Sequence, residues 1–262
     1  MLSLDRTDPV GMLQAIDYLA VRAREYEWLC TFVLRYASGT EGDGPDATVP
    51  MLPNMAFSVA LAKWEGERLG GGAAGSGAPP TWPDGRGPLD SLTWAAAVHP
   101  RAVVALVAKL REKGACRGRE WDELLAAPLF RKADFGGSAS LEHLTRLFVE
   151  RSHPLWRAEI AQAFLLRGAK AAAQAAGEAG EGVVEGITVA DWRAVVGELF
   201  PADSANQFQH LNAEDFAEGQ QVIPEEEGRP MEPVAPDAGP HGQGTMWGII
   251  QALMPWYRGP GA

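Results

Sequence analysis

The stretch that decides the fold reads LPNMAFSVALA and covers residues 52–62. Pro53 stands where a helix can begin, because the N–H groups of the first helical turn have no partner within the helix. The residues that follow carry no charge as far as position 62, and Phe57 and Leu61 lie four apart on one stripe. A helix that is apolar on all sides is buried among other helices. We therefore expect residues 53–69 to form the central helix of an all-helical domain.

Helical patterns continue on both sides of this segment, and no stretch reads as a convincing strand. A long helix is expected over residues 9–36, where Asp8-Pro9 can start it and apolar residues recur at helical spacing. His-Pro pairs at 99–100 and 153–154 divide one helix from the next, since the residue before a proline avoids the α region. Further helices are expected over residues 89–98, 100–113, 120–126, 141–152, 154–176, 188–200 and 245–254. The pattern predicts an all-α fold of stacked antiparallel helix pairs, similar to an α-solenoid of the tetratricopeptide type, although no clean 34-residue repeat is present.

Segments rich in glycine and proline interrupt the helices. Low-complexity insertions, expected to be disordered, are placed near residues 38–50, 70–88 and 177–187. Residues 214–244 read as an acidic, Pro-rich linker that has too few large apolar residues to order itself. The expected organisation is a helical domain over residues 1–213, this linker, and a C-terminal helix over residues 245–262 that docks on the domain.

Charge and cysteine content limit the classes of function. The net charge is −11, of which residues 214–241 carry −7, so the expected helical part is only mildly acidic and suggests no bulk affinity for nucleic acid. The two cysteines, Cys30 and Cys116, have no metal-binding spacing and read as free thiols of a reducing compartment. No apolar run reaches the roughly 18 residues of a membrane span, and the N-terminus lacks an apolar signal core. We expect the cytoplasm, or also the nucleus, and no membrane.

Four motifs occur in a fixed order along the chain. They are D-P-x-x-x-L-x-x-I-D-Y-x-A-x-R over residues 8–22, LPN-x-AFS-x-x-LA over 52–62, RSH-x-LW over 151–156 and LMPWY over 253–257. Together these motifs resemble the transcription factor 25 family, also known as ribosome quality control complex subunit 1. The resemblance implies that the chain corresponds to the C-terminal half of the family's proteins.

The resemblance also implies a function. It suggests a non-enzymatic subunit of the ribosome quality control complex, which acts on 60S ribosomal subunits that carry stalled nascent chains. Its implied partners are the E3 ligase listerin, ubiquitin and the AAA segregase that extracts the substrate. The alternative, suggested by the family's older name, is a nuclear transcription-associated regulator. Direct DNA binding is not expected, because the chain has no basic stripe and no recognition-helix signature.

The sequence predicts no catalytic residue, no cofactor and no metal. Residues 70–75 match the dinucleotide pattern G-x-G-x-x-G, but they follow a predicted helix instead of a strand and lie in low-complexity sequence. The five histidines show no helical pair at i, i+4 and no nearby cysteine, so a zinc site has little support. His99 and His153 each precede a proline, where capping or packing at a helix break is the simpler role.

Candidate partner-contact residues fall into an aromatic and a basic group. The aromatic group flanks helix breaks or termini, where indole rings are often half-buried, and comprises Trp156, Trp192, Trp247, Trp256 and Tyr257. The basic group holds five cations in eleven residues and comprises Lys109, Arg111, Lys113, Arg117 and Arg119. For each tryptophan intramolecular packing is the competing interpretation, and for the basic group it is neutralisation of a helix C-terminus. Other tryptophans, Trp28, Trp64, Trp94 and Trp121, are interpreted as core.

Overall fold

The computed structural model describes residues 11–38, 48–70, 82–177, 182–206 and 208–216. The chain divides into one compact unit over residues 1–220 and a second over 221–262. All described residues belong to the first unit. The Asp8-Pro9 helix entry, most of the acidic linker and the C-terminal helix with Trp247, Trp256 and Tyr257 lie outside the described residues.

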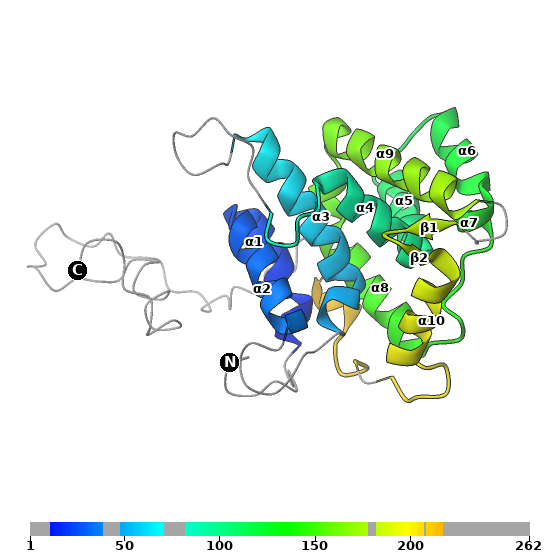
Figure 1. The fold of residues 1–262 in the computed structure, drawn as a ribbon. Coiled ribbons are helices and arrows are strands. Elements are labelled where there is room, and N and C mark those ends of the chain that lie inside the picture. The colour runs from blue at the N-terminus through cyan, green and yellow to red at the C-terminus, as the bar shows by residue number, and fades with distance from the viewer. Residues whose placement is uncertain (1–10, 39–47, 71–81, 178–181, 207, 217–262) are drawn as a thin grey trace, which may run out of the picture. The chain divides into compact units, whose positions relative to one another are not determined.

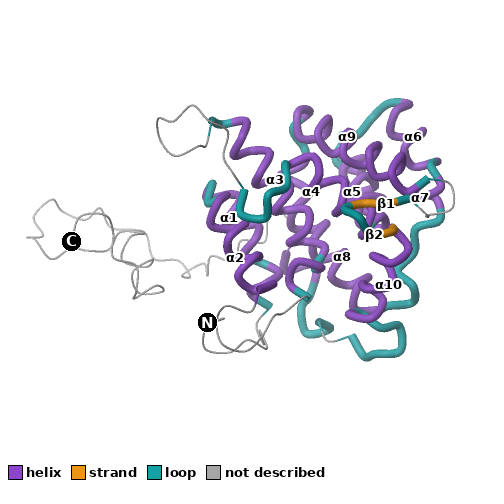
Figure 2. Tube along the Cα trace, in the orientation of Figure 1, coloured by secondary structure: helices purple, strands orange, loops and turns teal. Residues whose placement is uncertain are grey.

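Helices dominate the described part of the chain (Figures 1 and 2). The α-helices are α1 Ile16–Ala23, α2 Tyr26–Ser38, α3 Pro53–Arg68, α4 Pro88–Val98, α5 Pro100–Glu112, α6 Arg119–Ala126, α7 Pro128–Arg131, α8 Ala139–Ser152, α9 Glu159–Ala176 and α10 Val189–Leu199. Short 3-10 helices are η1 Met12–Gln14, η2 Val49–Met51, η3 His153–Trp156 and η4 Ala213–Phe216. Two-residue strands β1 Val183–Val184 and β2 Ile187–Thr188 pair antiparallel. The predicted all-α fold of stacked helices is confirmed.

Helix α3 is the central element, as residues 52–62 predict. It packs against α1 and α2 on one side and against α4 and α8 on the other, and α9 packs on the far side of α4 (Figure 1). Phe57 of α3 is fully buried and stacks on Phe148 of α8, with ring centroids 5.3 Å apart. The Trp156 ring packs edge-on against the Phe57 ring, with ring centroids 6.5 Å apart. The apolar circumference of α3 therefore builds a core shared by helices from both sides.

The single long helix expected over residues 9–36 is wrong, because the described part begins with η1, α1 starts only at Ile16, and the helix is broken at Arg24. This residue takes a left-handed conformation with φ of 63°. The Glu25 amide donates to the Ala20 carbonyl at 2.9 Å and the Arg24 amide donates to the Val21 carbonyl at 3.1 Å, a pattern that ends α1. The break separates α1 from α2, so the two segments pack on α3 as individual helices.

The other helix boundaries largely follow local sequence signals. Proline occupies the first turn of α3, α4 and α5, and His99 divides α4 from α5. Thr188 caps α10: its Oγ1 accepts from the Asp191 amide at 3.0 Å and donates to Asp191 Oδ2 at 2.6 Å. Thr188 therefore marks the start of α10. At the second His-Pro pair the chain first forms η3, and α9 begins only at Glu159.

The predicted disordered insertions contain ordered elements at their edges. Within 38–50, Val49 begins the short helix η2 and is buried. Within 177–187, strands β1 and β2 are joined by Glu185 and Gly186, both with positive φ, as a two-residue hairpin turn requires. Near the end of 70–88, Trp82 is 5% exposed. The described ends of these segments therefore belong to the folded unit, and residues 39–47, 71–81 and 178–181 lie outside the described residues.

Hydropathy gives a limited result for membrane spans. In the described segments no individual helix is both long and apolar enough to cross a bilayer. Helices α4 and α5 meet the length and composition criterion only as a pair, and they are bent by 100° at His99.

Candidate protein-contact surface

Two of the sequence motifs meet at a buried carboxylate. Asp17, from the first motif, is fully buried at the start of α1. Asn54 Nδ2 donates to Asp17 Oδ1 at 3.0 Å, and Ser58 Oγ donates to Asp17 Oδ2 at 2.6 Å. Asn54 also donates to the Leu13 carbonyl at 2.8 Å. Burial raises the pKa of Asp17, and the hydrogen bonds from Ser58 and Asn54 offset part of this effect. The motif side chains thus join α1 to α3.

The third motif lies beside this junction. Arg151 donates to the carbonyl of Gln14, and its guanidinium lies 5.9 Å from the centre of the Tyr18 ring. Burial lowers the pKa of Arg151 to about 10, although the negative charge of Asp17 opposes the shift. His153 is 1% exposed, and its Nδ1 lies 3.0 Å from the Glu150 carbonyl, which places it as a packing residue at the helix break. These motif residues therefore connect helices within the domain.

A second buried polar cluster surrounds a lysine. Lys63 on α3 is fully buried, and its Nζ donates to both carboxylate oxygens of Asp84 at 2.6 and 2.7 Å. It also donates to Ser91 Oγ at 2.8 Å and to the Arg86 carbonyl at 3.2 Å. Trp82 covers the same region, and its Nε1 donates to Glu67 at 3.1 Å. The cluster ties the segment before α4 to the central helix.

The described members of the predicted aromatic group take two different positions. Trp156 is 1% exposed and belongs to the core, so its ring is not available to a partner at the surface. Trp192 is half-buried, donates from Nε1 to the Val184 carbonyl at 3.0 Å, and meets Trp94 edge-on with ring centroids 5.6 Å apart. Both rings thus serve intramolecular packing, and part of Trp192 remains at the surface.

The predicted basic group is largely neutralised by neighbouring acids. Three of its members form ion pairs: Lys109–Glu150 at 2.7 Å, Arg111–Asp122 at 2.6 Å and Arg119–Glu123 at 2.7 Å. Lys113 and Arg117 are exposed and form no ion pair within the described residues. With most of its charge paired, the group makes a poor phosphate-binding patch.

An aromatic ladder on α2, which the sequence did not reveal, joins the exposed ring of Trp28 to the half-buried rings of Phe32 and Tyr36. Trp28 is 45% exposed, although its helical position suggested a core residue, and it is the most exposed tryptophan in the described ranges. Its ring stacks on Phe32 at 5.0 Å, and Phe32 lies 4.8 Å from the ring of Tyr36. Exposed tryptophan is enriched in protein interfaces. The spacing i, i+4, i+8 was the available signal, but it cannot tell which side of the helix is covered.

Metal-binding geometry does not appear in the described residues. Across the described ranges no three side chains of His, Cys, Asp or Glu are grouped so as to hold a metal ion. The polar clusters around Asp17 and around Lys63 are held by hydrogen bonds between their own residues, and in the Asp17 cluster Asn54 Oδ1 is left without a partner within the described residues. The surface that remains as a candidate contact is the aromatic ladder of α2.

Comparison with known proteins agrees with the motif resemblance. A family model described as transcriptional repressor TCF25 matches residues 1–229. No curated protein and no solved structure matches the chain. The family match covers most of the sequence and includes three of the four motifs. In the structure, residues from these three motifs lie together around Asp17. The chain belongs to the transcription factor 25 family.

Proposed function

We propose that this chain is a non-enzymatic subunit of the ribosome quality control complex. In this role it acts in the cytoplasm with a listerin-type E3 ligase on 60S subunits that carry stalled nascent chains. It promotes degradative ubiquitination of those chains, before an AAA segregase extracts them. The observation that carries the proposal is the family match over residues 1–229.

The structure supports a role in holding proteins together. Motif residues such as Asp17 and Ser58 are used to join helices, and they line no open site. The aromatic ladder of α2 exposes Trp28, a side chain of the kind that anchors protein interfaces. Most cations of the basic group form ion pairs with neighbouring acids, so they are less available to the phosphates of ribosomal RNA. This favours contacts with proteins. We assign the ladder to the contact with the ligase.

The test is affinity purification of the tagged full chain from cells that express a stalling reporter. We expect 60S subunits and the listerin-type ligase to co-purify, and to be recovered less with a reporter that does not stall. Trp28→Ser should reduce recovery of the ligase. Leu89→Ser is the matched control, because Leu89 is also exposed, at 37%, but lies on α4. If the two variants recover the ligase equally, the aromatic ladder is not the contact with the ligase.

A second candidate function follows from the description of the family as a transcriptional repressor. On this reading the chain is an adaptor in nuclear regulatory complexes. The same purification separates the two candidates. Recovery of chromatin-associated factors without 60S subunits would contradict the ribosome role and support the nuclear one.

A further inference from the structure

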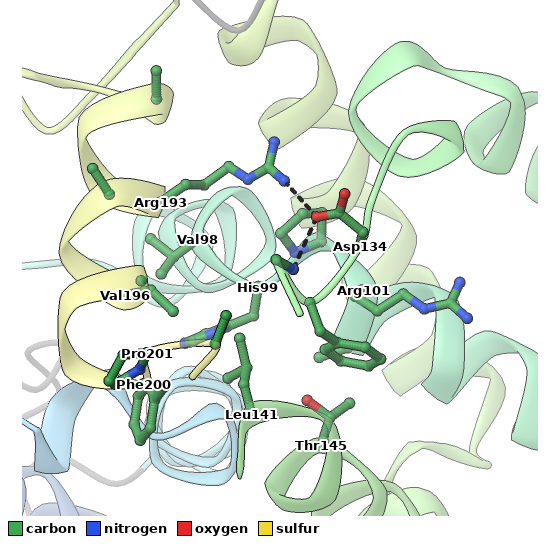
Figure 3. Close-up of a pocket in the computed structure, with 18 residues that line it drawn as sticks. Val98, His99, Arg101, Asp134, Leu141, Thr145, Arg193, Val196, Phe200 and Pro201 are labelled. Atoms are coloured by element: carbon green, nitrogen blue, oxygen red, sulfur yellow. Dashed lines mark hydrogen bonds and ion pairs between the residues drawn. The ribbon is translucent and has the colours of Figure 1, made fainter. Parts of the chain in front are cut away.

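Helix α10 has an apolar side that the described part of the chain covers only in part. Val189 and Val196 are the buried residues of this helix, and they face the rest of the domain. A second side borders a hollow that is also lined by the junction of α4 and α5 and by α8 (Figure 3). A third side carries Trp192, Val195 and Leu199, none of which lines the hollow. This third side is therefore turned away from the hollow.

The three apolar residues of this side, the α10 strip, form one continuous row. They stand at positions i, i+3 and i+7, so they follow a single line along the helix surface for about 10 Å. Val195 is 36% exposed, and Trp192 and Leu199 are half-buried. Val183, which is 55% exposed, pairs with the cap residue Thr188 and extends the apolar surface at the N-terminal end of the helix.

The indole ring of Trp192 is held in one orientation. Its Nε1 donates to the Val184 carbonyl at 3.0 Å, and the ring meets Trp94 edge-on with ring centroids 5.6 Å apart. A side chain that is already fixed loses little conformational entropy when a partner covers it. Tryptophan is also enriched among the residues that contribute most to binding at protein interfaces. Trp192 is therefore suited to anchor a partner at one end of the strip.

The border of the α10 strip is negative. Asp191 and Glu198 are exposed on the same side of the strip, and neither forms an ion pair within the described residues. Arg193 is the cation of this helix, but it lies on the other side and pairs with Asp134 at 3.3 Å. Glu198 lies in the last turn, where the exposed carbonyl groups of the helix end add negative potential and no basic residue offsets it. This border therefore attracts a cation from another molecule.

We propose that the α10 strip binds an amphipathic helix of a partner protein, whose apolar face is edged by Lys or Arg. Apolar side chains at helical spacing on the partner pack along the strip, as in other helix-in-groove contacts. The cations of the partner lie near Asp191 and Glu198, which favours a basic helix over an acidic one.

The same charges disfavour a second copy of this chain as the occupant, because the copy would bring its own acids to the border. The α10 strip is separate from the aromatic ladder of α2. The inference therefore goes beyond the proposed function and does not depend on which complex the chain joins.

The test uses a phage-displayed library of helical peptides, selected on the full chain and counter-selected on Val195→Ser/Glu198→Lys. We expect the selected peptides to share apolar residues at helical spacing with Lys or Arg beside them. Synthetic copies, measured by calorimetry, should bind this double variant at least about tenfold more weakly than the unchanged chain. Ile160→Ser/Glu159→Lys is the matched control, because it makes the same kinds of change at exposed residues of α9 and should leave the affinity unchanged.

A charge exchange separates a lost contact from a lost fold. Peptide copies in which the edge Lys or Arg is replaced by Glu should bind Glu198→Lys at least about threefold more tightly than they bind the unchanged chain. A gain in affinity of this kind cannot come from a variant that fails to fold.

A second readout follows Trp192 directly. In the ¹⁵N-labelled chain, the indole Nε1 resonance that is missing from Trp192→Phe should move when a selected peptide is added, because the peptide covers this ring. The proposal is overturned by an acidic or non-helical consensus, by equal affinity for Val195→Ser/Glu198→Lys, by a charge exchange without a gain, or by an unchanged Trp192 resonance at saturation. It is also overturned if the unchanged chain sediments as a dimer that Val195→Ser/Glu198→Lys converts to a monomer, because the strip then contacts a second copy.

Discussion

Ser58 Oγ donates a 2.6 Å hydrogen bond to Asp17 Oδ2, and the two residues are 41 positions apart in the sequence. Asn54 donates to the other oxygen of the same carboxylate. Side chains from two of the family's sequence motifs therefore form one contact between α1 and α3. The contact is fully buried, so its contribution to stability depends on the protonation state of Asp17.

The first prediction concerns pH. Burial raises the pKa of Asp17 above its ordinary 3.8, so the folded state binds the proton more tightly than the unfolded state. The resulting stabilisation is complete below pH 3.8 and is lost as the pH rises through the folded pKa. In Asp17→Asn this component is absent. Denaturant unfolding between about pH 4.5 and 7.5 should show the stability advantage of the unchanged chain over the variant shrinking with pH. A difference that stays constant would contradict the raised pKa.

The second prediction concerns the ion pair between the buried Lys63 and Asp84, whose side chain is 27% exposed. Asp84→Ala leaves the buried ammonium without its carboxylate, and we expect a loss of about 1–3 kcal/mol in unfolding free energy, because water can reach the site through the exposed side of the pair. Replacing both partners, as Lys63→Met/Asp84→Ala, should restore part of this loss, since no unpaired charge remains. Urea unfolding of the single and double variants measures the coupling. If the free-energy loss of the double variant equals the sum of the losses in the two single variants, the coupling energy between Lys63 and Asp84 is zero.

The third prediction compares two helical glycines. A Cβ on Gly168 of α9 would lie 2.4 Å from Leu92 Cγ of α4, so Gly168→Ala should destabilise the chain by about 1–3 kcal/mol. A Cβ on Gly197 of α10 would meet nothing within 4 Å. Gly197→Ala should therefore stabilise by about 0.5–1 kcal/mol through helix propensity. A melting temperature that does not fall for Gly168→Ala would show that α4 and α9 are not closely packed there.

The fourth prediction tests the central helix. Phe57→Asp places a carboxylate among Phe148 and Trp156, where it has no partner, and the loss should approach the total stability of the domain. Leu19→Asp, at a position on α1 that is 55% exposed, should change the melting temperature little. Circular dichroism distinguishes the two variants. A cooperative transition retained by Phe57→Asp at the original temperature would refute the assignment of α3 as the core.

The fifth prediction concerns the two thiols. Both are free and buried, and burial raises the pKa of Cys30 to about 12 and that of Cys116 to about 11. Because the thiolate is the reactive form, both should resist a thiol reagent at about pH 8 in the folded chain. Both should react at once in guanidinium. Rapid modification of one thiol without unfolding would show that its helix opens locally.

Features with a local signal could be predicted from the sequence. Pro53, the two His-Pro pairs and the Thr188–Asp191 pair each mark a helix boundary through a steric or capping effect within a few residues. The charge-free stretch around Phe57 identified the central helix for a similar reason. At these positions the helix boundaries in the structure lie within a few residues of the predicted ones. The structure adds only which residues each helix contacts.

Features that depend on distant residues could not be predicted in this way. Arg24 breaks a continuous helical pattern in a left-handed conformation, which no local residue type announces. Lys63 is a charged residue in the core, and its burial depends on acceptors from distant residues, Asp84 and Ser91 among them. The pocket beside His99 combines parts of α4, α5, α8 and α10, so it becomes visible only when their packing is known (Figure 3).

The placement of α4 between α3 and α9 also sets an order of events during synthesis. About 60 residues separate the end of α4 at Val98 from the start of α9 at Glu159. At roughly 5–20 residues per second, that interval takes about 3–12 seconds. During this time α4 can pack on α3, but its α9-facing side, with Leu92, has no cover. We expect the growing chain to engage chaperones at this stage, and to release them once α9 emerges.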